Sequence, residues 1–126
     1  MVKLKRVYEP PSREDGYRVL VERLWPRGIR KKDLPLDAWL RDIAPSTELR
    51  KWFGHDPTRW GEFQRRYVKE LRAGPALQQL RTLAERASQG TVTLLFSSHD
   101  MEHNNAVVLK SEIDDLVREK DWRPRA

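Results

Sequence analysis

The sequence predicts an α/β domain with a small, mainly parallel sheet of about three strands and helices packed around it. Three short apolar runs indicate the strands, at residues 2–8, 17–24 and 91–96. The excursion between the second and third runs has helical periodicity throughout, and a last amphipathic helix follows the third run. A strand, a polar loop and a helix form the closing unit of parallel α/β folds. Three strands make a small sheet, so an additional short strand or a dimer remains open.

The three apolar runs differ in their pattern. In the first, Val2 and Leu4 alternate with Lys3 and Lys5, which is typical of a half-buried strand. The second centres on the continuous apolar run 19–21, which favours a strand buried on both faces. The third, TVTLLF, is also apolar and β-rich.

The helices are predicted from apolar spacing and from capping residues. A short helix is expected between Pro35 and Pro45, because apolar residues recur there at i, i+3, i+4 and i+7: Leu36, Trp39, Leu40 and Ile43. Further helices are expected over residues 47–53, 57–72, 75–89 and 105–117, with starts at Ser46, Asp56-Pro57, Pro75 and Asn104 or Asn105.

Length and composition limit the classes of protein. A chain of 126 residues is the size of one domain, which we place at residues 1–118 with a flexible tail at 119–126. The absence of cysteine excludes disulfides and thiolate chemistry. The sequence shows neither a secretory signal nor an apolar run long enough to span a membrane, so we expect a cytoplasmic protein with no membrane partner.

Two polar segments follow the ends of the second and third strands, at residues 23–28 and 97–105. If these strands are parallel neighbours, both segments meet at one sheet edge, where open α/β sheets bind ligands. Arginine forks match phosphate or carboxylate, and the N-terminus of the last helix favours an anion. We therefore expect a small anionic, phosphate-bearing ligand, such as a nucleotide, to bind there through Arg23, Trp25, Arg27, Ser97 and Asn105.

His55, His99 and Asp100 are the candidate catalytic residues, although the sequence does not decide whether the protein is an enzyme. Each also has a structural interpretation, since His55 precedes the capping pair Asp56-Pro57. His99 and His103 lie four residues apart, but in a loop, so we expect no metal. A triad of Ser97 or Ser98 with His99 and Asp100 is disfavoured because residues adjacent in sequence rarely face one another. Without a P-loop or G-x-G-x-x-G motif, no cofactor is expected.

Two other functions remain open. The net charge is +6, and Trp25 lies among basic residues that could bind nucleic acid: Arg23, Arg27, Arg30, Lys31 and Lys32. However, the 25 Lys and Arg residues are interleaved with 19 Asp and Glu residues, as on an ordinary solvated surface. A structural or protein-interaction role without a ligand is the other alternative. The sequence does not predict the oligomeric state.

The chain resembles the YeaO-like proteins, domain of unknown function 488, over nearly all of residues 1–117. The resemblance is densest at residues 16–28, which end in Leu-Trp-Pro-Arg-Gly. It continues through these segments: Trp39 to Ser46, Leu49 to Phe53, His55 to Pro57, Phe63, Tyr67, Glu70-Leu71, Thr93 to Leu95 and Asn104 to Leu109. The resemblance implies a compact α/β domain and no particular activity.

The chain departs from the family pattern at two places. Glu22 stands where these proteins are expected to have Asp. Residues 96–100 read Phe-Ser-Ser-His-Asp, where the family more often has Tyr-Ala-Ala-Lys-Asp. His99 thus replaces a basic residue and carries a positive charge only at lower pH. The replacement of alanine by Ser97 and Ser98 argues against a serine nucleophile common to the family.

Overall fold

The computed structural model describes residues 1–120, and its centre is an all-parallel sheet of four strands. The strands are β1 (Val2–Arg6), β2 (Tyr17–Leu20), β3 (Ala38–Trp39) and β4 (Val92–Phe96). Their spatial order is β1-β4-β2-β3. The α/β prediction is confirmed, and the additional short strand that the sequence left open is β3.

Four helices complete the fold: α1 (Thr47–Phe53), α2 (Trp60–Leu71), α3 (Gly74–Gln89) and α4 (Asn105–Glu119). Short 3-10 turns lie at Arg13–Asp15, Lys31–Asp33 and Pro57–Arg59. The expected caps are present, because Ser46, Asp56 and Asn104 each accept a backbone N–H of the following turn. Within residues 1–120, no helix is long and apolar enough to span a membrane.

The helix predicted between Pro35 and Pro45 is wrong. Asp37 and Leu40 donate backbone N–H groups to carbonyls of β2 at 2.9 and 3.0 Å, so the segment forms a parallel edge strand. Its apolar side chains do not share one helix face but divide between the two sides of the sheet: Leu36 and Trp39 on one, Leu40 and Ile43 on the other. With prolines at both ends, hydrogen bonding to β2 satisfies the backbone better than two isolated helical turns would.

The core has two parts, one on each side of the sheet. The larger part contains apolar residues of all four helices packed on one face of the strands. The smaller part lies on the opposite face and consists of Val7, Leu20, Leu34 and Leu95, covered by loop and edge residues Trp25, Ile29, Leu36 and Trp39. The helices therefore form a single layer, and the chain between β2 and β3 covers the other face.

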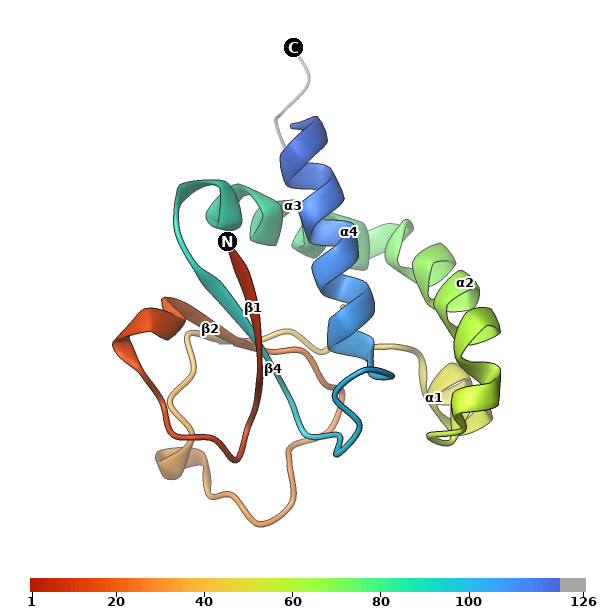
Figure 1. Ribbon diagram of the computed structural model, residues 1–126, viewed down its shortest axis with the longest axis horizontal. Coiled ribbons are helices and arrows are strands. Elements are labelled where there is room, and N and C mark those ends of the chain that lie inside the picture. The colour runs from red at the N-terminus through yellow and green to blue at the C-terminus, as the bar shows by residue number, and fades with distance from the viewer. Residues whose placement is uncertain (121–126) are drawn as a thin grey trace.

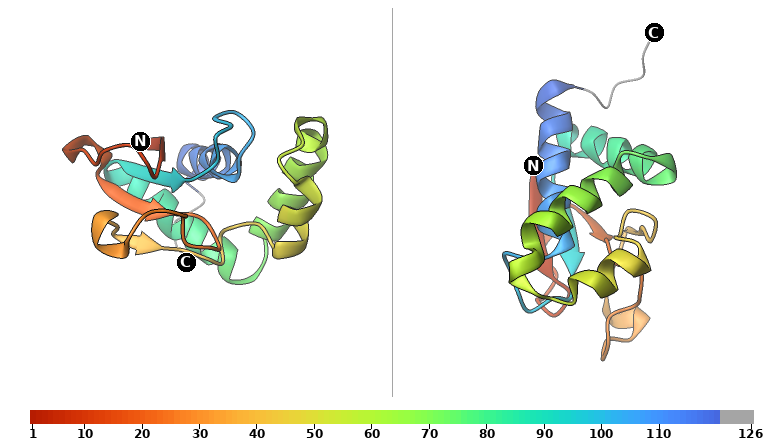
Figure 2. Two further views of the ribbon diagram at one scale, coloured as in Figure 1. Left: turned by 90° about the horizontal axis from the view of Figure 1, so that it is seen from below. Right: turned by 90° about the vertical axis from the view of Figure 1, so that its right-hand side faces the viewer.

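The α1–α2 pair stands beside the sheet and not over its centre (Figures 1 and 2). Two positive φ angles, at Gly54 (53°) and His55 (58°), turn the chain between α1 and the 3-10 turn that leads into α2. This places the end of α1 next to the loops that leave β2 and β4. The predicted tail begins at Glu119, which ends α4, and its residues 121–126 lie outside the described part of the chain.

Candidate functional site

The two polar segments meet because β2 and β4 are parallel neighbours, with Tyr17 to Leu20 in register with Val92 to Leu95. The Glu22 carboxylate joins them directly. It accepts the backbone N–H of Ser97 at 2.6 Å and the Ser97 hydroxyl at 2.8 Å. At the same edge, the Asn105 side-chain amide donates to the carbonyl of Val21 at 2.7 Å and ties the start of α4 to β2.

A cavity of about 640 Å³ opens at this edge, between the strand-end loops and the α1–α2 pair. Every residue that the sequence predicted for the site lines it: Arg23, Trp25, Arg27, His55, Ser97, His99, Asp100 and Asn105. Its volume lies within the roughly 300–1,000 Å³ typical of ligand sites. The structure thus brings the predicted residues together, although their roles stay predictions.

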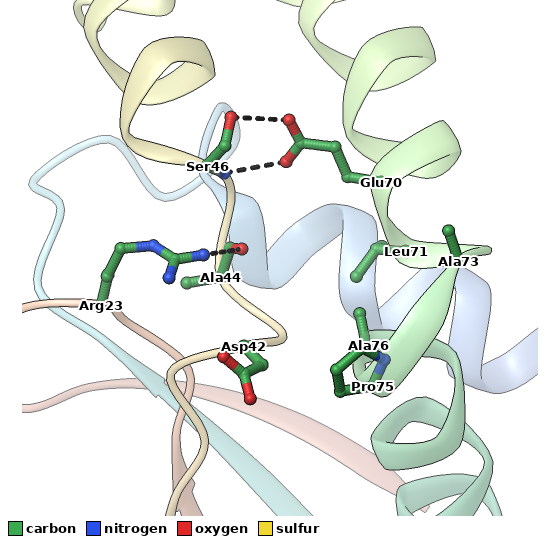
Figure 3. A pocket seen from close by; sticks show the side chains of 9 residues that line it. All are labelled: Arg23, Asp42, Ala44, Ser46, Glu70, Leu71, Ala73, Pro75 and Ala76. Atoms are coloured by element: carbon green, nitrogen blue, oxygen red, sulfur yellow. Dashed lines mark hydrogen bonds between the residues drawn. The ribbon is translucent and has the colours of Figure 1, made fainter.

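Arg23 is fixed by backbone carbonyls of the segment before α1. Its guanidinium donates to the Ala44 and Pro45 oxygens, each at 3.2 Å. Arg23 also lines a second cavity of about 340 Å³. Figure 3 shows it near the Ser46–Glu70 clamp, in which the Ser46 backbone N–H and hydroxyl donate to the Glu70 carboxylate. It therefore forms part of the wall shared by two cavities, and two of its donor groups are already used.

Trp25 and Arg27 differ in how firmly the protein holds them. The Trp25 indole N–H donates to the Ile29 carbonyl at 2.7 Å, and its ring packs edge-on against Trp39 at 5.3 Å. Its ring thus helps to cover the smaller core. Arg27 is exposed, and its carbonyl accepts the Tyr8 hydroxyl at 3.1 Å. Within residues 1–120, the Arg27 guanidinium has neither a hydrogen-bond nor an ion-pair partner.

Asp100 organises its own loop. Its carboxylate accepts the backbone N–H groups of Glu102 and His103 at 2.9 Å, and the His103 ring nitrogen Nδ1 lies 2.9 Å from its other oxygen. The backbone hydrogen bonds, together with His103, hold the pKa of Asp100 below its usual value. Asp100 is therefore a poor general base near neutral pH, because a weakly basic carboxylate does not readily take a proton.

The two candidate histidines line the cavity but have different neighbours. His99 approaches Arg6, with 3.4 Å between its Nδ1 and the arginine Nη2, while Arg6 also donates to the carbonyls of Ser97 and Ser98. His55 lies at the turn after α1, exposed and with its ring 6.4 Å from that of Phe53. No hydrogen bond from the His55 side chain is formed within the described part of the chain.

Sequence reasoning missed two residues of the cavity wall as candidates for an anion site. Arg50 projects from α1 and, like Arg27, has no side-chain hydrogen bond or ion pair within residues 1–120. His103 contacts Asp100 and packs its ring edge-on against Trp60 at 5.2 Å. Nothing in the sequence indicates Arg50 as a site residue, because only the tertiary packing of the α1–α2 pair brings it to the sheet edge.

A metal site has no support from the arrangement of the side chains. No three His, Cys, Asp or Glu residues among positions 1–120 lie close enough together to hold an ion. His99 and His103, four residues apart, have different neighbours, Arg6 for the first and Asp100 with Trp60 for the second. Their spacing in the sequence therefore does not become a chelating pair.

A model of the family described as "Inactive DUF488-N3 subclade" matches residues 1–126. The uncharacterised protein YeaO of Escherichia coli is 45% identical over 108 residues, which cover 86% of this chain and 92% of YeaO. The chain belongs to the YeaO-like DUF488 family. The uncharacterised protein Rv3073c of Mycobacterium tuberculosis is 44% identical over 108 residues, covering 86% of this chain and 89% of that protein. No solved structure matches the chain significantly.

Two of the positions at which the sequence was expected to depart from the family pattern, Glu22 and Ser97, meet at one contact. The Glu22 carboxylate accepts a hydrogen bond from the Ser97 hydroxyl. An alanine there would keep the backbone hydrogen bond but lose the hydroxyl bond. The Ser97 hydroxyl therefore adds a side-chain hydrogen bond to the contact between the two strand-end segments.

Proposed function

We propose that this protein binds a small phosphate-bearing anion in the cavity at the carboxyl ends of β2 and β4. One observation carries the proposal: Arg27 and Arg50 face this cavity without a partner within residues 1–120, while both lining carboxylates are engaged. Glu22 accepts hydrogen bonds from Ser97, and Asp100 from its own loop. Unpaired guanidinium groups that line a concave site favour phosphate, because their planar forks match its oxygens.

The start of α4 adds to this preference. Asn104, the N-cap, is buried and uses its side-chain oxygen for Val107, while Asn105 lines the cavity. The first turn of a helix carries partial positive charge and free N–H groups. These groups add hydrogen-bond donors to the wall that Arg27 and Arg50 also line.

The local chemistry supports binding more than turnover. The pKa of Asp100 is held low by hydrogen bonds from its own loop, so this carboxylate is not prepared as a general base. The description of the matching family model as inactive agrees with this proposal. The proposed role is therefore that of a binding protein.

A thermal-shift and calorimetric screen of the full chain tests the proposal, with phosphate, sugar phosphates and nucleotides as probes. A ligand at 100 times its dissociation constant stabilises the protein by about 2.7 kcal/mol. Arg27→Ala and Arg50→Ala should each lose the shift. Arg13→Ala is the matched control, because it removes one exposed arginine at the amino edge of the sheet, where Gly16 and Tyr17 contact Thr91. If no phosphate compound binds, or if the control behaves like Arg27→Ala, the proposal is wrong.

Nucleic-acid binding is the second candidate, and one surface favours it. Arg41 stacks on Trp39 at 3.8 Å, Lys31 lies 6.0 Å from the Trp25 ring centre, and Arg30 and Lys32 are also exposed nearby in sequence. Basic and aromatic groups together suit single-stranded nucleic acid. This role predicts binding of an oligonucleotide that weakens steeply with salt and is reduced by Lys31→Ala.

The cytoplasmic location expected from the sequence also stays a prediction, which cell fractionation would test.

A further inference from the structure

The cavity is much larger than its anionic ligand group requires. An inorganic phosphate held by Arg27 and Arg50 would leave most of the 640 Å³ to water. Organic ligands fill sites of this size and bury most of their own surface in them. The remaining volume therefore belongs to a second part of the ligand, whose chemistry the rest of the wall determines.

That wall is largely apolar. Most of its lining surface is contributed by apolar atoms, and its apolar residues, which stand beside polar ones such as Ser98, His103 and Asn105, are Leu24, Trp25, Pro26, Ala44, Pro45, Phe53 and Phe63. Phe53 and Phe63 are stacked at 4.4 Å and almost fully buried, so the aromatic cluster of α1 and α2 borders the cavity. Such a surface favours an apolar group, because burial removes both it and the ligand from water.

Leu24 is the clearest sign of a missing apolar contact. Its side chain is 60% exposed, and it belongs to neither of the two core clusters, yet it lines this cavity. Its neighbour Trp25 packs against the smaller core, so Leu24 is left on the solvent side of the same turn. Contact with a ligand would remove this exposed leucine from water.

We infer that the cavity selects a phosphomonoester whose organic part is an apolar or aromatic group, over inorganic phosphate and over sugar phosphates. This inference rests on the proposed function, since Arg27 and Arg50 supply the phosphate contacts. The apolar part lies between Leu24 and the surface formed by Phe53 and Phe63. A nucleotide base is one group with such a face, and a simple phenyl ring isolates the same property.

Calorimetric titration of the full chain with phenyl phosphate, glycerol phosphate and inorganic phosphate tests the inference. All three are phosphate anions, so they differ mainly in the group attached to phosphate. Phenyl phosphate should bind roughly tenfold tighter than glycerol phosphate, the difference expected when a ring leaves water. Leu24→Ser should weaken phenyl phosphate about fivefold and leave glycerol phosphate unchanged.

Met101→Ser is the matched control, because Met101 is 50% exposed in a neighbouring loop but does not line the cavity. It should bind phenyl phosphate as the unaltered protein does. Equal affinity for phenyl and glycerol phosphate, both lost in Arg27→Ala, would overturn the inference and leave the proposed function standing. Equal losses in Leu24→Ser and Met101→Ser would also overturn it. If none of the three compounds binds, both this inference and the proposed function are wrong.

Discussion

The carboxylate of Glu22 accepts both the backbone N–H and the hydroxyl of Ser97, which lie on chain segments leaving neighbouring strands. The contact closes the edge of the sheet where β2 and β4 end, and it is partly buried. A hydrogen bond to a charged acceptor contributes about 1.5–3 kcal/mol to stability. Because Glu22 and Ser97 both line the cavity, the contact stabilises the cavity wall as well as the end of the sheet.

Substituting Glu22 and Ser97 one at a time should distinguish the contributions of the two hydrogen bonds to stability. Glu22→Ala should lower the free energy of unfolding by about 2 kcal/mol, because it leaves the partly buried Ser97 N–H without its acceptor. Ser97→Ala should cost only about 1 kcal/mol, since the backbone bond remains. Urea unfolding monitored by tryptophan fluorescence measures both, and Arg13→Ala serves as the surface control. Equal losses in the two variants would contradict this division.

The Ser46–Glu70 clamp should control the position of the α1 wall. Glu70 accepts the Ser46 N–H at 2.8 Å and the Ser46 hydroxyl at 2.6 Å (Figure 3). The same hydroxyl caps α1 by accepting the N–H of Leu49. Glu70→Ala should cost about 1–2 kcal/mol, and it should also weaken ligand binding through Arg50. Glu70→Gln, which keeps an acceptor, should show smaller losses in both measurements. Unchanged affinity in Glu70→Ala would show that α1 is held by its core contacts alone.

The loop from Asp100 to His103 should lose stability in acid. The pKa of Asp100 is lowered from 3.8 by hydrogen bonds from the loop backbone and by His103. A carboxylate with a lowered folded-state pKa stabilises the fold above its unfolded pKa and loses this contribution as the pH falls through the folded value. Stability should thus decline below about pH 4, and Asp100→Asn should show a shallower decline. Midpoints of urea unfolding from pH 7 to pH 2 measure it. An identical pH profile in the variant would contradict the role of Asp100.

The ion pairs of Asp15, in the turn between β1 and β2, predict a larger loss of stability. Asp15 is 4% exposed and accepts Arg18 Nη1 at 2.5 Å and Lys5 Nζ at 3.0 Å. Burial alone would raise the pKa of Asp15, but its hydrogen bonds to Ser12, Lys5 and Arg18 outweigh burial and lower it. Asp15→Ala should cost about 3–5 kcal/mol, because it leaves the buried Arg18 charge uncompensated. A cost below that of Glu22→Ala, measured in the same way, would contradict this.

The sequence predicts more of the sheet edge than of the cavity behind it. Once β2 and β4 are parallel neighbours, the meeting of residues 23–28 and 97–105 follows from strand direction alone. The caps at Ser46 and Asn104 are local hydrogen-bonding patterns, so the sequence reveals them too. These successes share one property, namely that neighbours in sequence or in strand order determine them.

The failures involve contacts that neither periodicity nor spacing encodes. Residues 36–43 have helical spacing, but hydrogen bonding to β2 makes them an edge strand. Arg50 reaches the cavity only through the packing of α1 and α2 beside the sheet. Trp25 lines the cavity as expected, but the contacts that hold its indole N–H and ring, to Ile29 and Trp39, were not predicted. In each case tertiary packing supplies the deciding interaction.

Arg23 and Arg27, four residues apart, should respond differently to the same substitution. Arg23 donates to the carbonyls of Ala44 and Pro45 and lines both cavities, so Arg23→Ala should lower both stability, by about 1–2 kcal/mol, and ligand affinity. Arg27 has no such anchor, and Arg27→Ala should reduce affinity alone. Arg23→Lys distinguishes the causes, because an ammonium keeps the charge but cannot reproduce the two-carbonyl fork. It should retain part of the affinity while losing most of the stability. If Arg27→Ala destabilises the fold as much as Arg23→Ala, the division of the two arginines into anchor and ligand contact is wrong.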